Sequence, residues 1–467
     1  MKSAVVLMIL ALSLSGCAVG PRYREPALEL PQSYRSYATQ QEGEAMINLP
    51  WWQVFKDETL QELIREALLN NYDLRTAAAR VDEAHAVIGV TRAQILPQTD
   101  LTSNVSRDRN SPDLYPALER LTSTYVGGFN TAWEMDIWGK IRQSIRASKA
   151  EYLATEDARR GVMVSLVADV AQTYFSLLEL DLELDIAKKT LQTRSDNLDL
   201  FNKRLKGGVA SELETSRAEA DYEQTASNIP ELERQIATQE NRLSQLLGRN
   251  PGPVERKAAL SQESFTPVLP GSGLPSDLLK RRPDIQEAEQ FLRAANAQVG
   301  VAVGDFLPSI NLTNFVGGAG ERISHVFDSE GYTWSIGGNM DLPLFKGGKN
   351  VYGYQAARAR WQQSVSTYQQ TVVTAFQEVA DALAGIDKVR GIREAQEKQV
   401  AALAKASKLS RIRYEDGLSS YLEVINADQQ YYDAQNILAR TLGSQVNYYV
   451  QLYRALGGGW QVEENQK

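Results

Sequence analysis

The sequence is poor in the residues that most enzymes and metal sites use. Its 467 residues include one cysteine, Cys17, and two histidines, His85 and His325, which stand far apart. One cysteine forms no disulfide within the chain, and neither histidine has a second ligand at a metal-binding spacing. Nucleophilic catalysis by a Cys–His pair is excluded if Cys17 carries lipid, and a Ser–His–Asp triad is not expected from two isolated histidines. We therefore expect neither an enzyme nor a bound metal or cofactor.

The sequence also lacks an excess of positive charge. It has 50 Lys and Arg against 58 Asp and Glu, a formal net charge of −8, and both signs are mixed along the chain. Nucleic-acid binding depends on a basic face that neutralises phosphates. We therefore expect no nucleic acid among the partners of this protein.

An apolar run of the length of a signal peptide opens the chain. Lys2 supplies a positive charge, and Ala4–Leu14 is apolar almost throughout but too short to span a membrane. The residues Leu14-Ser15-Gly16-Cys17 resemble the bacterial lipoprotein box, which implies that residues 1–16 are removed and that Cys17 is acylated. A covalent acyl lipid on Cys17 would hold the exported protein on a membrane leaflet. The alternative is an ordinary signal peptide that is followed by a cysteine by chance.

Two segments of the first half recur in the second half. Tyr72–Thr102 matches Pro283–Thr313, and Lys203–Ala220 matches Ile412–Gln429 at nearly the same offset. In the second pair the coinciding residues are Arg204, Gly208, Ser211, Leu213, Glu214 and Ala218, which meet Arg413, Gly417, Ser420, Leu422, Glu423 and Ala427. Two ordered matches indicate a tandem duplication.

The duplication sets the expected domain organisation. Each half reads as a helix, two strands, a long helix, a turn and a second long helix. We expect the first repeat at residues 51–248, an inter-repeat linker at 249–275 and the second repeat at 276–460. A lipidated N-terminal linker, residues 17–50, precedes the repeats, and a C-terminal tail, residues 461–467, follows them.

A leucine at every seventh residue predicts long helices that wind on one another. A continuous helix from Gly139 to Leu205 would be about 100 Å long. Pro230 predicts a break or a kink near Asn228 in the helix that follows. The leucines of the stripe are Leu177, Leu184, Leu191, Leu198 and Leu205, and Leu180, Ala187 and Phe201 fill the companion positions.

Alternation in Ser123–Asp136 and Gly331–Asp341 predicts strands with one apolar face and one polar face. Gln98–Asp108 and Ser309–Gly320 are the expected hairpin partners. A half-buried soluble sheet gives the same alternation, but with an exported, lipidated chain it matches a membrane barrel. The side chains expected to face lipid are Tyr125, Phe129, Trp133, Tyr332 and Trp334, and those expected to face a lumen are Glu134, Asp136 and Asp341.

The number of strands requires several copies of the chain. Two hairpins supply four strands, which cannot close a barrel, and open sheet edges are not tolerated in hydrocarbon. Two copies would give eight strands with a filled interior, and three copies would give twelve strands and room for a lumen. The barrel must therefore be shared between subunits.

The duplicated plan and several ordered motifs resemble the TolC/OprM-like outer membrane efflux ducts. The motifs are "LLKRRPDIQEAE", "DFLPSINLT", "YLEVINADQQ" and "YRALGGGW", which begin at Leu278, Asp305, Tyr421 and Tyr453. The resemblance implies a mainly α fold with a membrane β-barrel portion. It also implies a homotrimer with a twelve-stranded barrel that is continued by a long α-helical barrel in the periplasm. Its partners would be outer membrane lipid, a periplasmic adaptor and an inner-membrane efflux transporter.

The same resemblance places a closing region at the turns "KGGVAS" and "EDGLSS". Leu213 and Leu422 would form apolar constrictions, and Arg217 and Asn426 would face the pore one helical turn further along. Some relatives carry aspartate at the position of Asn426, so an asparagine ring here departs from a charge-sensitive gate. Two further residues, Arg413 and Tyr414, lie where the family has side chains that bridge neighbouring hairpins. The alternative is that Leu213, Leu422 and Tyr414 only pack the coiled coil.

Together these features predict a passive exit duct that carries out no chemistry. We expect it to conduct drugs or other small molecules from the adaptor and the transporter to the cell exterior. A duct of the same architecture for metal ions is the first alternative. The second is a periplasmic coiled-coil lipoprotein that acts as a scaffold and does not conduct.

Overall fold

The computed structural model describes residues 18–28, 31, 55, 57–111, 113, 119–256, 260 and 275–458. The signal peptide, Cys17 and most of both predicted linkers lie outside the described residues. The chain divides into two compact units, each assembled from three separate segments. Unit 1 comprises residues 1–27, 79–156 and 287–369, and unit 2 comprises residues 28–78, 157–286 and 370–467.

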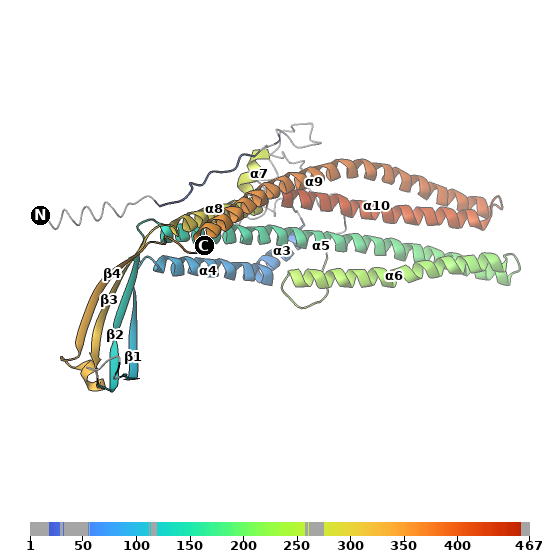
Figure 1. Cartoon of the computed structure of the whole chain (residues 1–467). Helices are drawn as coiled ribbons and strands as arrows, with labels where there is room; N and C mark the ends of the chain where they lie inside the picture. The colour runs from blue at the N-terminus through green and yellow to red at the C-terminus, as the bar shows by residue number, and fades with distance from the viewer. Residues whose placement is uncertain are drawn as a thin grey trace. The chain divides into compact units, whose positions relative to one another are not determined.

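The elements of the second half repeat those of the first half (Figure 1). In chain order they are α3 (Glu58–Asn70), α4 (Tyr72–Ala93), β1 (Gln98–Arg109), β2 (Leu121–Met135), α5 (Lys140–Lys206), α6 (Glu212–Leu246), α7 (Pro275–Arg281), α8 (Pro283–Gly304), β3 (Ser309–Gly320), η3 (Ile323–Phe327), β4 (Tyr332–Asp341), α9 (Lys349–Glu415) and α10 (Tyr421–Ala455). The helices α4 and α8 both have 22 residues, α5 and α9 have 67, and α6 and α10 have 35. Equal lengths at equal places confirm the predicted duplication.

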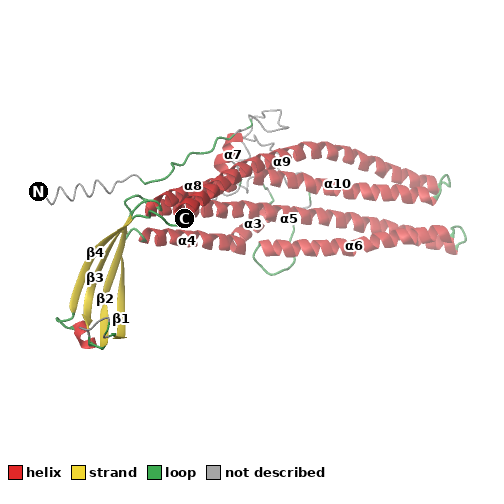
Figure 2. Ribbon diagram, in the orientation of Figure 1, coloured by secondary structure: helices red, strands yellow, loops and turns green. Residues whose placement is uncertain are grey.

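Unit 1 contains a single antiparallel sheet of four strands in the order β1-β2-β3-β4 (Figure 2). Each half of the chain supplies one hairpin, and the two hairpins join because β2 pairs with β3. Among the residues that the structure describes, β1 and β4 each pair on one side only, so the sheet has two open edges. This confirms the prediction of four strands per chain.

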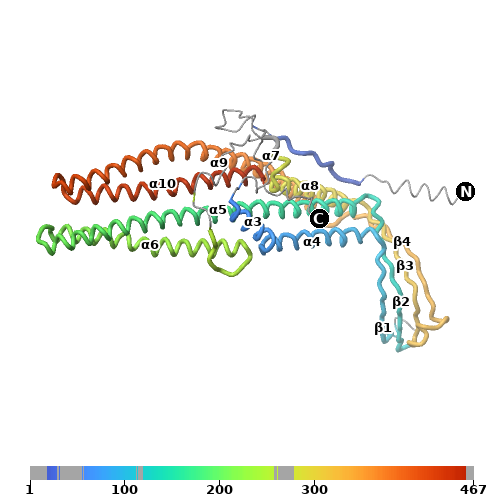
Figure 3. Tube along the Cα trace, turned by 180° about the vertical axis from the view of Figure 1, so that it is seen from behind, coloured from blue at the N-terminus to red at the C-terminus, as the bar shows by residue number. Residues whose placement is uncertain are grey.

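Unit 2 is dominated by helical hairpins whose arms lie side by side, α5 with α6 and α9 with α10 (Figure 3). The predicted stripe on α5 is buried at Leu177, Ala187 and Phe201. Its partner stripe is buried at Leu232 and Leu243 of α6. At about 1.5 Å per residue, α5 is about 100 Å long, as the heptad spacing predicted.

Helix α6 runs from Glu212 to Leu246 without interruption at Pro230, so the predicted break does not occur. Proline removes one hydrogen bond from a helix interior, and the carbonyl left free four residues earlier must find another partner. Pro230 is exposed, which lets water serve that carbonyl. The long packed stripe on either side of Pro230 keeps the helix in one piece.

An aromatic core joins the start of the first repeat to the end of the second within unit 2. The ring of Phe55 lies 5.8 Å from the ring of Tyr453 and 6.3 Å from that of Phe175. Asp57 accepts a hydrogen bond of 3.1 Å from the Leu60 backbone and thereby caps α3, and the Tyr174 hydroxyl donates to the same carboxylate at 2.8 Å. The two repeats therefore share one core in this unit.

One helix of the described chain, α5, is long and apolar enough to cross a membrane by length and composition alone. Of its most apolar window, 61% is buried inside the chain. The core residues of unit 2, among them Val167, Val170 and Leu178, account for that apolarity.

Candidate functional site

The register of the sheet brings the apolar residues of both hairpins onto one face. Residues directly opposite each other in an antiparallel pair point to the same side. Phe129 lies opposite Leu101 on β1 and Val316 on β3, and Val316 in turn lies opposite Trp334 on β4. The apolar residues of this face are Leu101, Val105, Leu121, Tyr125, Phe129, Trp133, Met135, Ile310, Leu312, Val316, Tyr332, Trp334, Ile336 and Met340, and Thr99, Ser103, Arg107, Thr131 and Asn314 lie among them.

The opposite face of the sheet is mainly polar. Asp100 of β1, Asn130 and Glu134 of β2, Asn311 of β3 and Ser335 of β4 lie on it. Phe315 is its aromatic exception, and it covers two glycines. A Cβ added at Gly128 or at Gly317 would lie 2.9 Å from the tip of the Phe315 ring, so the ring occupies the space that these residues leave empty.

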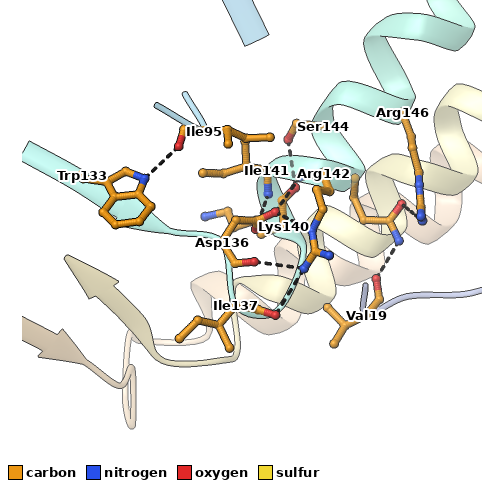
Figure 4. A network of polar contacts seen from close by, with 11 residues as sticks. Val19, Ile95, Trp133, Asp136, Ile137, Lys140, Ile141, Arg142, Ser144 and Arg146 are labelled. Carbon is orange, nitrogen blue, oxygen red and sulfur yellow. Dashed lines mark hydrogen bonds and ion pairs between the residues drawn. The ribbon is translucent and has the colours of Figure 1, made fainter. Parts of the chain in front are cut away.

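The apolar face is largely exposed in the single chain. Phe129 is 57% exposed, Tyr332 62% and Trp334 61%. Tyr125 and Trp133 are half-buried, and the Trp133 indole donates a hydrogen bond of 2.8 Å to the Ile95 carbonyl (Figure 4). A soluble sheet would cover such a face with its own core. This face instead needs an apolar environment from outside the chain.

A small polar cavity lies in unit 1 where the strands meet the helices. Its volume is about 260 Å³, and the three acidic residues predicted to face a lumen, Glu134, Asp136 and Asp341, all line it together with Lys140 and Lys346. Asp341 is exposed and pairs with Lys346 at 3.7 Å. The sheet–helix junction therefore gathers residues that are far apart in the sequence, and their position toward a lumen remains a prediction.

Asp136 also has a structural role at the start of α5. Its carboxylate accepts hydrogen bonds of 2.9 Å from the backbone N–H groups of Ile141 and Arg142 and pairs with the Arg142 side chain at 3.0 Å (Figure 4). Its side chain is only 9% exposed. Because the first turn of a helix carries free N–H groups and a partial positive charge, Asp136 anchors the start of α5. Alternation alone assigned it to the strand, which ends one residue earlier at Met135.

The two helical turns share one backbone design. Gly208 and Gly417 have φ of 75° and 72°, a left-handed conformation that glycine adopts without strain. In the first turn the N–H of Val209 donates to the Arg204 carbonyl at 2.9 Å, and in the second the N–H of Leu418 donates to the Arg413 carbonyl at 2.8 Å. Each long helix therefore ends at a left-handed glycine.

The predicted closing residues fall into two groups. Leu213, Arg217, Leu422 and Asn426 are exposed on α6 and α10, and each pair has the spacing of neighbours on one helix face. Arg413 pairs with Glu423 at 3.4 Å across its own turn. The exposure of Leu213, 61%, and of Leu422, 44%, does not fit packing within the single chain.

Tyr414 belongs to an aromatic cluster that joins the two hairpins. Its ring lies 6.0 Å from that of Phe201 and 5.5 Å from that of Tyr421, and the two latter rings are 4.0 Å apart. Arg204 donates to the Tyr414 hydroxyl at 3.1 Å and stacks over its ring at 5.5 Å. We call Phe201, Tyr414 and Tyr421 the tip cluster. Burial raises the pKa of the Tyr421 hydroxyl, and the nearby Asp221 and Asp428 raise it further.

Sequence reasoning missed Arg194, whose side chain is 5% exposed. Its guanidinium donates to the Asp221 carbonyl at 2.7 Å, to the Thr225 hydroxyl and to the Gln429 amide oxygen at 2.7 Å, and so ties α5 to α6 and α10. The sequence does carry a signal for Arg194, because this charged residue occupies the companion position of the leucine stripe between Ala187 and Phe201. A buried charge at such a position fixes the register of packed helices.

Within the described ranges, no group of three or more His, Cys, Asp or Glu side chains is placed to hold a metal ion. Burial raises the pKa of Glu179 on α5 to about 7, and the charge of Glu183 adds to this effect while Arg440 opposes it. These groups lie among packed helices of unit 2.

Comparison with known proteins gives the same plan. The family described as outer membrane efflux protein matches residues 63–249 and again residues 274–458, one match for each repeat. The cation efflux system protein CusC of Escherichia coli O6:H1 is 35% identical over 457 residues, which cover 97% of both chains. The solvent efflux pump outer membrane protein SrpC of Pseudomonas putida is 34% identical over 472 residues and the full length of both.

The structural comparison agrees with the sequence comparison. A crystal structure of CusC superposes with a TM-score of 0.85 and 33% identity, and the match covers 95% of this chain and all of that one. The chain therefore belongs to the outer membrane efflux protein family, and it is an outer membrane efflux channel protein of the tripartite-pump type, with a β-barrel portion and a periplasmic helical barrel.

Proposed function

We propose that three copies of this chain form a passive exit duct for organic small molecules. The observation that carries the proposal is the register of the sheet, which collects the apolar residues of both hairpins on one face and polar residues on the other. Closed around an axis with the apolar face outward, such sheets enclose a water-filled lumen. Three open sheets of four strands supply twelve strands, enough to leave that lumen open.

The remaining parts of the assembly follow from the same proposal. Acylated Cys17 would anchor each chain in the leaflet, after removal of residues 1–16, and residues 51–248 and 276–460 would act as the two repeats. A periplasmic adaptor and an inner-membrane transporter would deliver the cargo and supply the energy. The duct itself needs no catalytic group, because it only offers a continuous path.

The closing region would lie at the two helical turns. Leu213 and Leu422 are apolar and exposed in the single chain, so three copies of each can meet around an axis and exclude water. Arg217 and Asn426 lie four residues further along the same helices. A ring of Asn426 carries no charge, which suits cargo that is not selected by its positive charge.

Planar-bilayer conductance of the purified protein tests the duct and the gate together. We expect small, stable channels for the wild type and much larger ones for the Arg217→Ala, Leu422→Ala double variant. The matched control is Arg234→Ala, Ile437→Ala, which removes the same kinds of side chain from exposed positions of α6 and α10 away from the turns. The control should conduct like the wild type.

Each other outcome has a defined meaning. Channels that the double variant leaves unchanged would keep the duct and reject this gate. An equal increase in the control would mean loosened helices rather than an opened constriction. The absence of channels from all three proteins, despite demonstrated insertion and trimerisation, would reject the duct and favour a scaffold.

A second candidate cargo is a metal ion, which the similarity to a protein named as a cation efflux component supports. Deletion of this chain from its host distinguishes the two cargoes. Sensitivity to dyes, solvents and antibiotics should rise if the cargo is organic. A rise confined to metal salts would reject the organic cargo and leave the duct in place.

A further inference from the structure

The loop between β3 and β4 carries two large apolar side chains that no described part of the chain covers. This loop holds the single turn η3, which Figure 2 draws in red beside the far ends of the strands. Phe327 is 85% exposed and Ile323 64%. The loop is closed by ordered contacts, since the Ala319 N–H donates to the Gly331 carbonyl at 2.9 Å and the Gly331 N–H donates to Asp328 at 3.2 Å. Ile323 and Phe327 are therefore exposed on an ordered turn.

Glycines seat this turn on the apolar face of the sheet. A Cβ at Gly127 would lie 3.4 Å from a methyl group of Val326, one at Gly318 would collide with the Val326 backbone, and one at Gly320 would lie 2.6 Å from the Cβ of His325. Gly127 lies on the same side of β2 as Phe129, and Gly318 lies on the same side of β3 as Val316. The turn thus rests on the face that carries the exposed aromatic residues.

A neighbouring copy of the chain does not account for this exposure. The turn packs on β2 and β3, the two central strands, whereas further strands can pair only at the free edges of β1 and β4. Helices α5 and α9 follow β2 and β4 at the opposite end of the sheet from this loop. Because the helical barrel of this channel is periplasmic, the loop end faces the outer leaflet.

We propose that η3 is an interfacial lipid contact, with Ile323 and Phe327 inserted among the acyl chains of the outer leaflet where they meet the headgroups. This inference rests on the proposed membrane orientation of the sheet. The charged residues Glu321, Arg322 and Asp328 flank the two apolar side chains, so they keep the turn at the level of the headgroups and prevent deeper insertion. The contact would set the depth at which the sheet sits in the bilayer.

Spin labels on single cysteines test the contact, because the chain has only Cys17 and an acylated Cys17 has no free thiol. Variants Phe327→Cys and Ile323→Cys are labelled and reconstituted into vesicles of phosphatidylethanolamine and phosphatidylglycerol. Collisions with oxygen report lipid, and collisions with a water-soluble nickel complex report water. We expect oxygen accessibility to exceed nickel accessibility several-fold at both positions and the reverse at Ser324→Cys on the same turn.

Two reference positions separate this proposal from the proposed function. Ile336→Cys on the apolar face should report lipid, and Ser335→Cys on the polar face should report water. If position 336 reports lipid while positions 323 and 327 report water, the lipid contact is wrong and the duct stands. Labels at 323 and 327 that neither probe reaches would mean a protein neighbour and would also overturn the contact. If position 336 reports water, both proposals fail.

Discussion

The two helical turns share a backbone but not their side-chain contacts. In the first turn Ser211 and Glu214 cap each other, since the Glu214 N–H donates to the Ser211 hydroxyl at 3.3 Å and the Ser211 N–H donates to Glu214 at 2.9 Å. In the second turn Ser420 makes no side-chain cap, and the equivalent acid Glu423 pairs with Arg413. Duplication thus preserved the glycine turn while the polar residues around it acquired new partners.

The tip cluster consists of positions at which the two repeats differ. Because α5 and α9 have equal lengths and begin at Lys140 and Lys349, each residue of one has a counterpart 209 residues away in the other. In this correspondence Phe201 is equivalent to Ser410, Tyr414 to Leu205 and Tyr421 to Glu212. The similarities between the repeats build each hairpin, and the differences join the two hairpins to each other.

The largest expected effect comes from Phe201→Ala, which removes the centre of the tip cluster. Phe201 is 1% exposed, and loss of a buried phenylalanine costs about 3–5 kcal/mol. We expect urea unfolding of the detergent-solubilised protein to show a loss of that order. The near-isosteric Phe201→Leu should lose about 1 kcal/mol. Equal and small losses for both variants would mean that the rings meet without joining the hairpins.

A smaller effect concerns the pH dependence of stability, which should differ between the two long helices. Glu179 on α5 has its pKa raised from 4.5 to about 7 by burial, while its counterpart on α9, Lys388, is exposed. Because the pKa is raised, the fold favours the protonated carboxyl of Glu179. Its contribution to the free energy of unfolding is complete below pH 4.5 and is lost as the pH rises through about 7. Glu179→Gln should therefore be more stable than the wild type at pH 8, by about 1–2 kcal/mol after discounting for solvent, and equal to it near pH 4.

Thermal unfolding at a series of pH values measures this difference. Glu183→Gln is the control, because Glu183 pairs with Arg440 at 2.8 Å and its loss should destabilise the protein at neutral and alkaline pH. A stability gap between Glu179→Gln and the wild type that stays constant from pH 4 to pH 8 would contradict the role of Glu179 ionisation.

The smallest expected effect distinguishes the caps of the two turns. Ser211→Ala should cost about 1 kcal/mol, since it removes the acceptor of an N-terminal helix N–H, whereas Ser420→Ala should cost close to nothing. Hydrogen exchange at the first turns of α6 and α10 measures both locally. Equal acceleration in the two variants would show that the second turn is capped in solution as well.

Much of the fold could be predicted because its signals are periodic. The seven-residue leucine step gave α5 almost residue for residue, and the period of two gave β2 and β4. The repeat then supplied the order of elements. Of the break or kink predicted at Pro230, the break does not occur, because a single lost hydrogen bond is minor in a helix of 35 residues that packs along its length.

The contacts of individual side chains were less predictable. Asp136 continues the alternation of its strand, and only the position of the helix start shows that its carboxylate is used there. The tip cluster joins residues more than 200 positions apart, such as Phe201 and Tyr414, which no local pattern links. Arg194 could have been found, because a charge in a leucine stripe already breaks the local rule.

The open edges of the sheet make membrane entry depend on how much of the protein a cell makes. Each unpaired amide or carbonyl along β1 or β4 would cost several kcal/mol in hydrocarbon, so a lone chain cannot insert its strands. In the proposed trimer, insertion waits until the other copies pair both edges. For an assembly of several chains the inserted fraction then rises more steeply than the supply of chains. A modest increase in gene expression would thus produce a disproportionate increase in the number of ducts.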